Sequence, residues 1–355
     1  MLFSASALPA STWGHQAAGI AKTTLQKLEN DALGCTGIGR GRCHYSALVV
    51  FYGLSSTPFA RLLSELCEAW FRMLKGGIFN SISRIDLRNA WAKAKFGIAK
   101  DTGKIHSIKG IMSNIIYNLF SLSWLPMSFD VWIDPQNCAW KLDMLDSPKG
   151  IIRQLIQCYD RQQCMAAAKH QNGRGMEEGV DWQVTLSYLQ SQAFKSQEEY
   201  ASKCALEAII SGSTWSNARI HAIDSEHSEF CPRCGVVDSD LHTFWLCPHN
   251  KKIEHQAVIS TGKLTQIACT DSVDAPCLWL RGICPLQLTS IADEYLPSVE
   301  YHTKHIAYDE SPIADAIADS GIYYGEASGG RFSSYGPLIR CGVGLVIFLG
   351  KGAFR

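Results

Sequence analysis

The sequence predicts a mainly α-helical scaffold, followed by a small cysteine- and histidine-rich knuckle and a C-terminal β-hairpin. Three observations support this fold class. Apolar residues recur at spacings of three and four through most of the first 200 residues, as in amphipathic helices. Three cysteines and two histidines then lie within residues 231–250. The last segment, 321–355, joins a Gly/Ser-rich turn to a run of β-branched residues, which favours paired strands.

The composition is typical of a globular protein. Of 355 residues, 46% are hydrophobic and 19% are charged, and this length allows two or three compact units. No uninterrupted apolar run reaches the ~18 residues of a membrane span, so no span is expected, and the most apolar stretch, 108–132, is predicted to form a buried helix. The N terminus lacks the pattern of a secretory signal peptide. We therefore expect an intracellular protein, cytoplasmic or nuclear, whose 14 cysteines are mostly reduced.

Four segments carry the clearest helical pattern: 58–74, 83–97, 149–170 and 196–212. The first opens with Pro58 at a favourable first helical position. The second begins at Ser83, a candidate N-cap, with Asp86 three residues later.

The changes in pattern along the chain define five predicted segments. They are a basic helical region (1–148), a helical connector (149–220), the knuckle (221–255), a linker or weakly structured region (256–318) and the C-terminal hairpin (319–355).

The knuckle has the ligand types and spacing of a zinc site. Cys231-x2-Cys234-x7-His242-x4-Cys247 supplies three thiolates and one imidazole, which zinc prefers in a tetrahedral arrangement. Because protein side chains fill all four positions, no place remains for substrate or an activated water, and the Zn²⁺ is expected to be structural. His249 is the alternative histidine ligand, and His227 is a weaker one.

Charge is distributed unevenly along the chain. Residues 1–130 contain 14 Lys and Arg against 7 Asp and Glu, although the whole chain carries 33 of each. Such a basic region favours binding of RNA or DNA phosphates, and ordinary solvated surface charge is the alternative. The candidate nucleic-acid-binding residues are Arg72, Lys75, Arg84, Arg88, Lys93 and Lys95. Residues 215–255 include four basic and six acidic residues, so the knuckle itself is expected to bind phosphate poorly.

The segment 205–250 resembles part of the polyproteins of non-LTR (LINE-like) retrotransposons, in the region after the reverse transcriptase. There a helix ends in a Gly-x-x-Trp-x-x-x-Arg-like turn, and a zinc module with Cys-x-x-Cys-Gly, an acidic spacer, His, an aromatic residue and Cys-Pro follows. The matching positions are Gly212, Trp215, Arg219, Cys231, Cys234, Gly235, His242, Trp245, Cys247 and Pro248.

The C-terminal hairpin resembles the opening of the ribonuclease H domain that can follow this zinc module. The resemblance places the first metal-binding carboxylate of that domain at Glu326, where the family has aspartate. Two-metal sites are sensitive to carboxylate geometry, and the family's other carboxylates lie beyond the second strand, where this sequence ends. We therefore expect a truncated, vestigial site, with Mg²⁺ bound only if such a site were complete.

Three hypotheses follow for the function. The leading one is a non-catalytic fragment or remnant of a retrotransposon polyprotein, with a structural zinc site and nucleic-acid binding. The second is a ribonuclease H-type nuclease acting on RNA–DNA hybrids, in which carboxylates from 309–319 assist Glu326. The third is a zinc-stabilised protein-interaction module.

Overall fold

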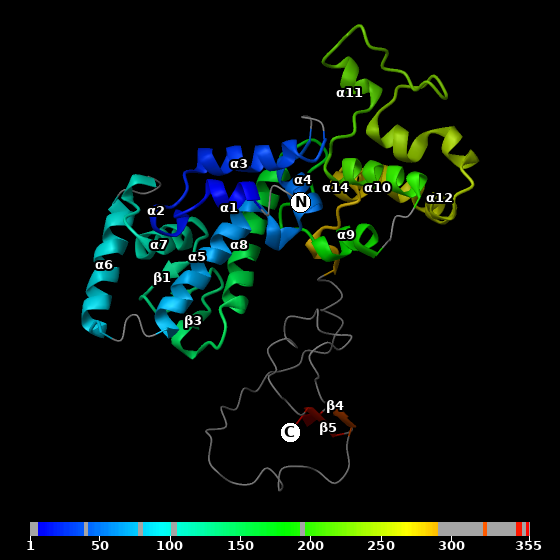
Figure 1. Ribbon diagram of the computed structural model, residues 1–355. Helices are drawn as coiled ribbons and strands as arrows, with labels where there is room; N and C mark the ends of the chain where they lie inside the picture. Colours follow the sequence, from blue (N-terminus) through cyan, green and yellow to red (C-terminus); the bar gives the residue numbers. More distant parts are fainter. Residues whose placement is uncertain are drawn as a thin grey trace. The chain divides into compact units, whose positions relative to one another are not determined.

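The computed structural model describes residues 6–38, 42–76, 81–100, 105–191 and 196–289, with three further strands at 322–324, 346–349 and 353–354. The chain divides into two compact units, Met1–Pro297 and Ser298–Arg355. The first unit is mainly helical and carries a small three-stranded sheet, as Figure 1 shows, so the predicted helical fold class is confirmed.

The N-terminal half of the first unit contains eight described α-helices and the sheet. Its elements are α1 (Leu8–Ser11), α2 (His15–Ala18), α3 (Lys22–Gly34), α4 (His44–Tyr52), η2 (Leu54–Ser56), α5 (Pro58–Lys75), α6 (Arg84–Lys100), η3 (Ile105–Ser107), α7 (Ile111–Ser121), β1 (Leu125–Pro126), β2 (Val131–Ile133), β3 (Ala139–Lys141), η4 (Leu142–Met144) and α8 (Lys149–Ala167).

Shorter helices make up the rest of this unit. They are α9 (Trp182–Ser191), α10 (Gln197–Ile210), α11 (Asn217–His221), the π-helical turn η5 (His242–Leu246), the 3₁₀ turns η6 (Pro248–Lys252) and η7 (Gly262–Leu264), α12 (Gln256–Thr261), α13 (Thr265–Asp271) and α14 (Pro276–Arg281). The last three helices lie where the sequence predicted a linker or weakly structured region.

All four strongly patterned segments are helices, α5, α6, α8 and α10. Local capping explains where three of them begin. The Thr57 hydroxyl accepts a hydrogen bond from the backbone of the first turn of α5, and Pro58 occupies the first helical position. Ser83 accepts from the Asp86 N–H at 3.1 Å, as expected for an N-cap. Ser196 begins α10 with a complete capping box.

The apolar stretch 108–132 is not one long helix. Helix α7 ends at Ser121, and Ser123 adopts a positive φ of 63°, which a continuing α-helix does not accommodate. The chain then enters the antiparallel sheet, in which β2 pairs with both β1 and β3. Across the described part of the chain, every helix is too short or too polar to cross a membrane.

Tryptophans fasten the sheet to the helices around it. The Trp70 indole on α5 donates to the Phe129 carbonyl at 3.0 Å, and the Trp91 indole on α6 donates to the Pro126 carbonyl at 3.4 Å. The two rings lie 5.8 Å apart and are almost fully buried. Because each indole N–H finds an acceptor, these large side chains can be buried without leaving a polar group unpaired.

One continuous apolar core runs from Cys43 to Ile283 and includes side chains of α4 through α10 and α14. The basic helical region and the helical connector therefore share their interior. In Figure 1, α5 lies beside α8, with α7 and α6 next to them. No cysteine in the described part of the chain is paired in a disulfide.

A buried carboxylate joins three helices within this core. The Asp160 Oδ1 atom accepts from the Tyr45 hydroxyl at 2.6 Å and from the Trp182 indole at 2.7 Å. Burial raises the pKa of Asp160, while the donors of Tyr45, Trp182 and Cys164 oppose the rise.

The second unit contributes an antiparallel sheet of β4 (Ile322–Tyr324), β5 (Val346–Leu349) and β6 (Ala353–Phe354), in which β5 is central. The paired strands predicted within 321–355 are present. Glu326 and the carboxylates of 309–319 lie outside the described residues.

The Asp160 network predicts a specific loss of stability. Asp160→Ala leaves the Tyr45 hydroxyl and the Trp182 indole buried without their acceptor, and each such group costs about 1–3 kcal/mol. We expect the free energy of unfolding in urea to fall by about 3 kcal/mol. Exposed Asp146→Ala is the matched control and should change it by less than about 0.5 kcal/mol. Equal effects of the two substitutions would contradict the assigned role.

Candidate metal centre

The first two candidate ligands lie on a tight hairpin. Phe230 and Val237 form an antiparallel bridge, and the Cys231 N–H donates to the Val236 carbonyl at 2.7 Å. Between them, Gly235 turns the chain with a φ of +75°, and its N–H donates to the Cys231 carbonyl at 2.8 Å. This positive φ is strained for residues with a Cβ, so glycine permits both cysteine side chains to face the same side.

The other two ligands lie at the ends of the π-helical turn η5. His242 begins this turn, and Cys247 follows its last residue. The Cys247 N–H donates to the His242 carbonyl at 2.9 Å, which closes the turn and brings both side chains toward the hairpin.

The four side chains converge on one point. Their ligand atoms all lie within 4.8 Å of one another, close enough to hold a metal ion. The Cys234 Sγ atom lies 3.2 Å from the His242 Nε2 atom and 4.0 Å from the Cys247 Sγ atom. A tetrahedral zinc ion with Zn–S bonds of about 2.3 Å requires sulfur–sulfur separations of about 3.8 Å. The donor set and its spacing therefore fit zinc.

Asp238 organises the backbone around the ligands. Its carboxylate accepts from the Asn217 N–H at 3.2 Å and from the Thr243 hydroxyl at 2.7 Å. It thus ties the start of α11 to the residue after His242. The Ser239 hydroxyl accepts from the His242 N–H at 3.1 Å and fixes the beginning of η5. These contacts orient a ligand-bearing segment by hydrogen bonds that do not involve the metal.

The thiols already differ in acidity. Burial opposes ionisation of Cys231, but the Arg233 N–H and the His242 ring outweigh it and lower the pKa of Cys231 to about 6. For Cys234, the Val236 N–H favours the thiolate, but burial and the neighbouring sulfurs together raise its pKa. A single thiolate can therefore start metal binding near neutral pH, and the divalent ion would then displace the remaining thiol protons.

The interior of this segment consists of metal ligands and small polar residues. Between residues 213 and 255 the buried residues are Ser216, Cys231, Asp238, His242 and Cys247. None of them is a large aliphatic or aromatic side chain. A segment of this size with no apolar interior needs a covalent or metal cross-link to hold one conformation.

One contact attaches the metal-binding segment to the scaffold, and others hold the segment itself together. The Trp245 indole donates to the Trp279 carbonyl on α14 at 2.7 Å, and the two rings meet edge-to-face at 5.6 Å. Asn250 accepts from the Arg233 guanidinium at 2.9 Å and donates to the Thr243 carbonyl at 3.1 Å. Asn250 thus links the hairpin that carries Cys231 and Cys234 to the turn η5.

The Gly-x-x-Trp-x-x-x-Arg turn has a structural role. The Arg219 guanidinium lies 4.6 Å from the centre of the Trp215 ring and donates to the Thr214 carbonyl at 2.7 Å. Gly212 has a φ of +70° and packs against the buried Arg281, which donates to the Ile210 carbonyl at 2.7 Å. The turn therefore sets the direction in which the chain leaves α10.

The alternative histidines are not part of the described cluster. The His227 Nε2 atom lies 3.1 Å from the Asn217 Oδ1 atom, and His249 belongs to the turn η6 after Cys247. The structure thus agrees with His242 as the fourth ligand.

The six basic candidates fall into two groups. Arg72 and Lys75 lie at the end of α5, and the Lys75 ammonium donates to the Asp143 carbonyl at 2.6 Å. Arg84 pairs with Asp130 at 2.6 Å. The Arg72 Nε atom donates to the Glu68 carbonyl. All three residues therefore take part in contacts within the chain. The remaining three, Arg88, Lys93 and Lys95, lie together on α6.

Several important residues were not identified from the sequence. Asp238 was counted only as a charge, although its place between two ligand pairs is a local signal that could have indicated an organising role. Arg281 and Trp279 carry no local signal, since their partners lie in distant parts of the chain.

Comparison with known proteins gives no family assignment: no family model, no curated protein and no solved structure matches the chain.

The cluster predicts one zinc ion per purified chain by elemental analysis. His242→Ala should lose most of it because three thiolates alone leave the tetrahedron incomplete, whereas His249→Ala should retain it. Cys234→Ser should also lose the ion. Zinc that remains in the His242 variant and disappears from the His249 variant would assign the fourth ligand to His249.

Proposed function

We propose that the chain is a zinc-stabilised, nucleic-acid-binding part of a retrotransposon-type polyprotein, acting by binding rather than by catalysis. The metal is zinc in a structural role, and its ligands are Cys231, Cys234, His242 and Cys247. In this proposal the zinc module serves as a rigid attachment at the end of the helical scaffold, and phosphate contacts come from the scaffold itself.

The observation that carries the proposal is the exposed surface of α6. This helix contains five Lys or Arg residues and one Asp. It buries only Leu87, Trp91 and Ile98. A helix that presents so many cations and so few carboxylates to solvent suits the phosphate backbone of RNA or DNA.

The geometry of α6 separates its cations into two rows. Residues seven apart lie on nearly the same face of a helix, so Arg88 and Lys95 form one row, and Lys93 and Lys100 form the other. Between the rows lies the Phe96 ring, which is 72% exposed. An aromatic ring flanked by cations is the arrangement used for single-stranded nucleic acid, where a base stacks on the ring and phosphates meet the cations.

The zinc module itself is expected to contribute little to phosphate binding. Two of the four basic residues between 215 and 255 take part in internal contacts, since Arg219 lies over Trp215 and Arg233 donates to Asn250. The neighbouring Asp238 and His242 are buried. The module is therefore assigned to support rather than to recognition.

A protein-interaction role for the same module is favoured by a separate observation. The hairpin exposes about half of the Phe230 and Val236 side chains, and Leu246 on η5 is exposed to a similar extent. Binding of an apolar partner to this hairpin would not weaken with salt, whereas phosphate binding would.

The phosphate role predicts a steep dependence on salt. For a single strand held by the four cations of the two rows, affinity should fall about 50-fold between 50 and 200 mM salt, as measured by fluorescence anisotropy with a labelled RNA. The triple variant Arg88→Gln, Lys93→Gln, Lys100→Gln should reduce the slope of log K against log salt by about 2.

A second triple variant gives the matched control for charge. Lys27, Arg153 and Lys169 are exposed basic residues on or directly after other helices, and replacing them by Gln removes the same charge. This control should keep most of the affinity. Equal loss in the two triple variants, or binding that is insensitive to salt, would contradict a site on α6.

A further inference from the structure

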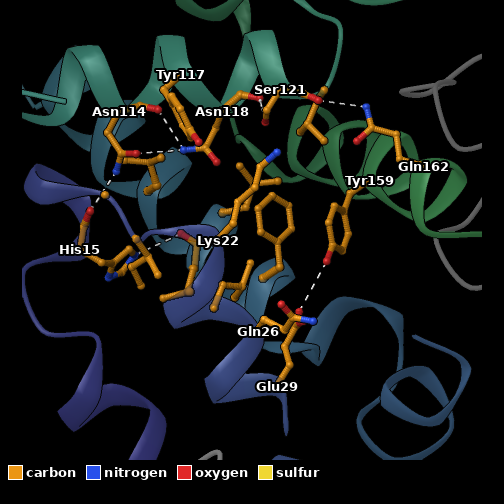
Figure 2. A pocket seen from close by; sticks show the side chains of 18 of the residues that line it. His15, Lys22, Gln26, Glu29, Asn114, Tyr117, Asn118, Ser121, Tyr159 and Gln162 are labelled. Carbon is orange, nitrogen blue, oxygen red and sulfur yellow. Dashed lines mark hydrogen bonds between the residues drawn. The ribbon is translucent and has the colours of Figure 1, made fainter. Parts of the chain in front are cut away.

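A cavity of about 360 Å³ lies in the helical scaffold, away from the metal ligands. Its walls come from five helices, α2, α3, α5, α7 and α8, and α4 contributes His44. This volume lies within the range of pockets that hold small organic ligands, which is roughly 300–1,000 Å³. Figure 2 shows its polar side chains, with Glu29 and Tyr159 on one side and Asn114 and Asn118 on another.

The inner end of the cavity holds an under-satisfied carboxyl group. Glu29 is 6% exposed, and its described hydrogen bond is a long one, 3.5 Å from the Tyr159 hydroxyl. Burial raises the pKa of Glu29 to about 7, and the Tyr159 hydroxyl opposes this rise only in part. N–H groups of a ligand would donate short hydrogen bonds to the ionised carboxylate and so supply the partners that it lacks.

A second polar atom in the lining of the cavity lacks a partner. The His44 Nε2 atom is buried and makes no hydrogen bond within the described structure. Buried polar atoms in native proteins are almost always paired, and an unpaired one at a cavity wall indicates a missing water or ligand.

The open end of the cavity carries positive charge. Lys22 begins α3, two helical turns before Glu29, which places the two residues about 10 Å apart along the helix axis. The Lys22 side chain extends into the space between α3 and α7 (Figure 2). A ligand that spans this length meets a hydrogen-bond acceptor at one end and a cation at the other.

The wall between these ends is flat and aromatic. The rings of Phe59 and Tyr159 are stacked, with centroids 4.0 Å apart. Leu62, Leu63 and Leu66 continue this wall along α5. Such a surface fits the face of a planar ring.

We propose that this cavity binds a guanine nucleotide, with the ring N–H and amino group on the Glu29 carboxylate and the phosphate on the Lys22 ammonium. Guanine presents two adjacent N–H donors, which match the two oxygens of a carboxylate. Adenine places an acceptor beside its amino group, and that acceptor would face the carboxylate lone pairs. The site is independent of α6 and of the metal ligands.

Isothermal titration calorimetry with GMP and guanosine tests this assignment on the full chain. Wild-type protein should bind both, and GMP more tightly. Glu29→Gln should weaken both ligands about tenfold or more, because a charged acceptor is replaced by an amide that also presents donors. Lys22→Gln should reduce the affinity for GMP to that for guanosine. AMP should bind at least about tenfold more weakly than GMP.

Lys27→Gln is the matched control because Lys27 lies on the solvent side of the same helix, and it should bind GMP as the wild type does. The proposal is overturned if wild-type protein binds no GMP at millimolar concentration. It is also overturned if Glu29→Gln binds guanosine unchanged, or if AMP and GMP bind equally.

A stability measurement shows that the Glu29 variant remains folded. Because the folded-state pKa of Glu29 is raised from 4.5 to about 7, ionisation of the carboxyl destabilises the fold increasingly over that interval and fully above it. Glu29→Gln should therefore raise the thermal midpoint by a few degrees at pH 8 and leave it unchanged near pH 4. The other titratable groups lining the cavity, His15, Lys22, His44, Tyr117 and Tyr159, are the same in both proteins. An unchanged or lower midpoint at pH 8 would contradict the burial of an ionised Glu29.

Discussion

The metal centre depends on one constraint: the segment between residues 213 and 255 has no apolar core of its own. Its five buried residues are three ligands and two polar residues, Ser216 and Asp238. The hydrophobic effect, which stabilises the helices of the scaffold, therefore contributes little here. Four converging ligands replace it, since a bound ion adds its binding free energy directly to folding. Once the ion is bound, the ligands are fixed in position, and so are the hydrogen-bonding groups that orient them.

The metal-binding segment and the scaffold are coupled through α14. The Trp279 carbonyl accepts a hydrogen bond from the Trp245 indole. Two residues later, the Arg281 side chain lies in the scaffold interior and donates to the Ile210 carbonyl at the end of α10. Burial lowers the pKa of the Arg281 guanidinium, so this contact places a cation in an unfavourable environment. Its position at the carbonyl end of a helix offsets part of that cost. The short helix α14 thus contacts the end of α10, from which the chain enters the segment, and Trp245 within the segment.

Local features were predictable from the sequence, and distant contacts were not. The helices α5, α6, α8 and α10 follow from apolar periodicity, and the metal ligands follow from their spacing within seventeen residues. The stretch 108–132 was expected to be a single helix, because composition alone does not show that Ser123 turns the chain. Glu29 and Tyr159 are 130 positions apart, so no sequence pattern indicated that they line one cavity. The roles of α6 and of Glu326 remain predictions.

The coordination of the metal in the purified chain tests the central claim most directly. X-ray absorption at the zinc edge reports the number and type of bound atoms and their distances. We expect three sulfur atoms at about 2.3 Å and one nitrogen at about 2.0 Å, with no bound water. A shell of oxygen and nitrogen atoms, or two sulfur atoms with water, would show that the ion is held elsewhere or by an open site. Either result would contradict a closed structural centre formed by Cys231, Cys234, His242 and Cys247.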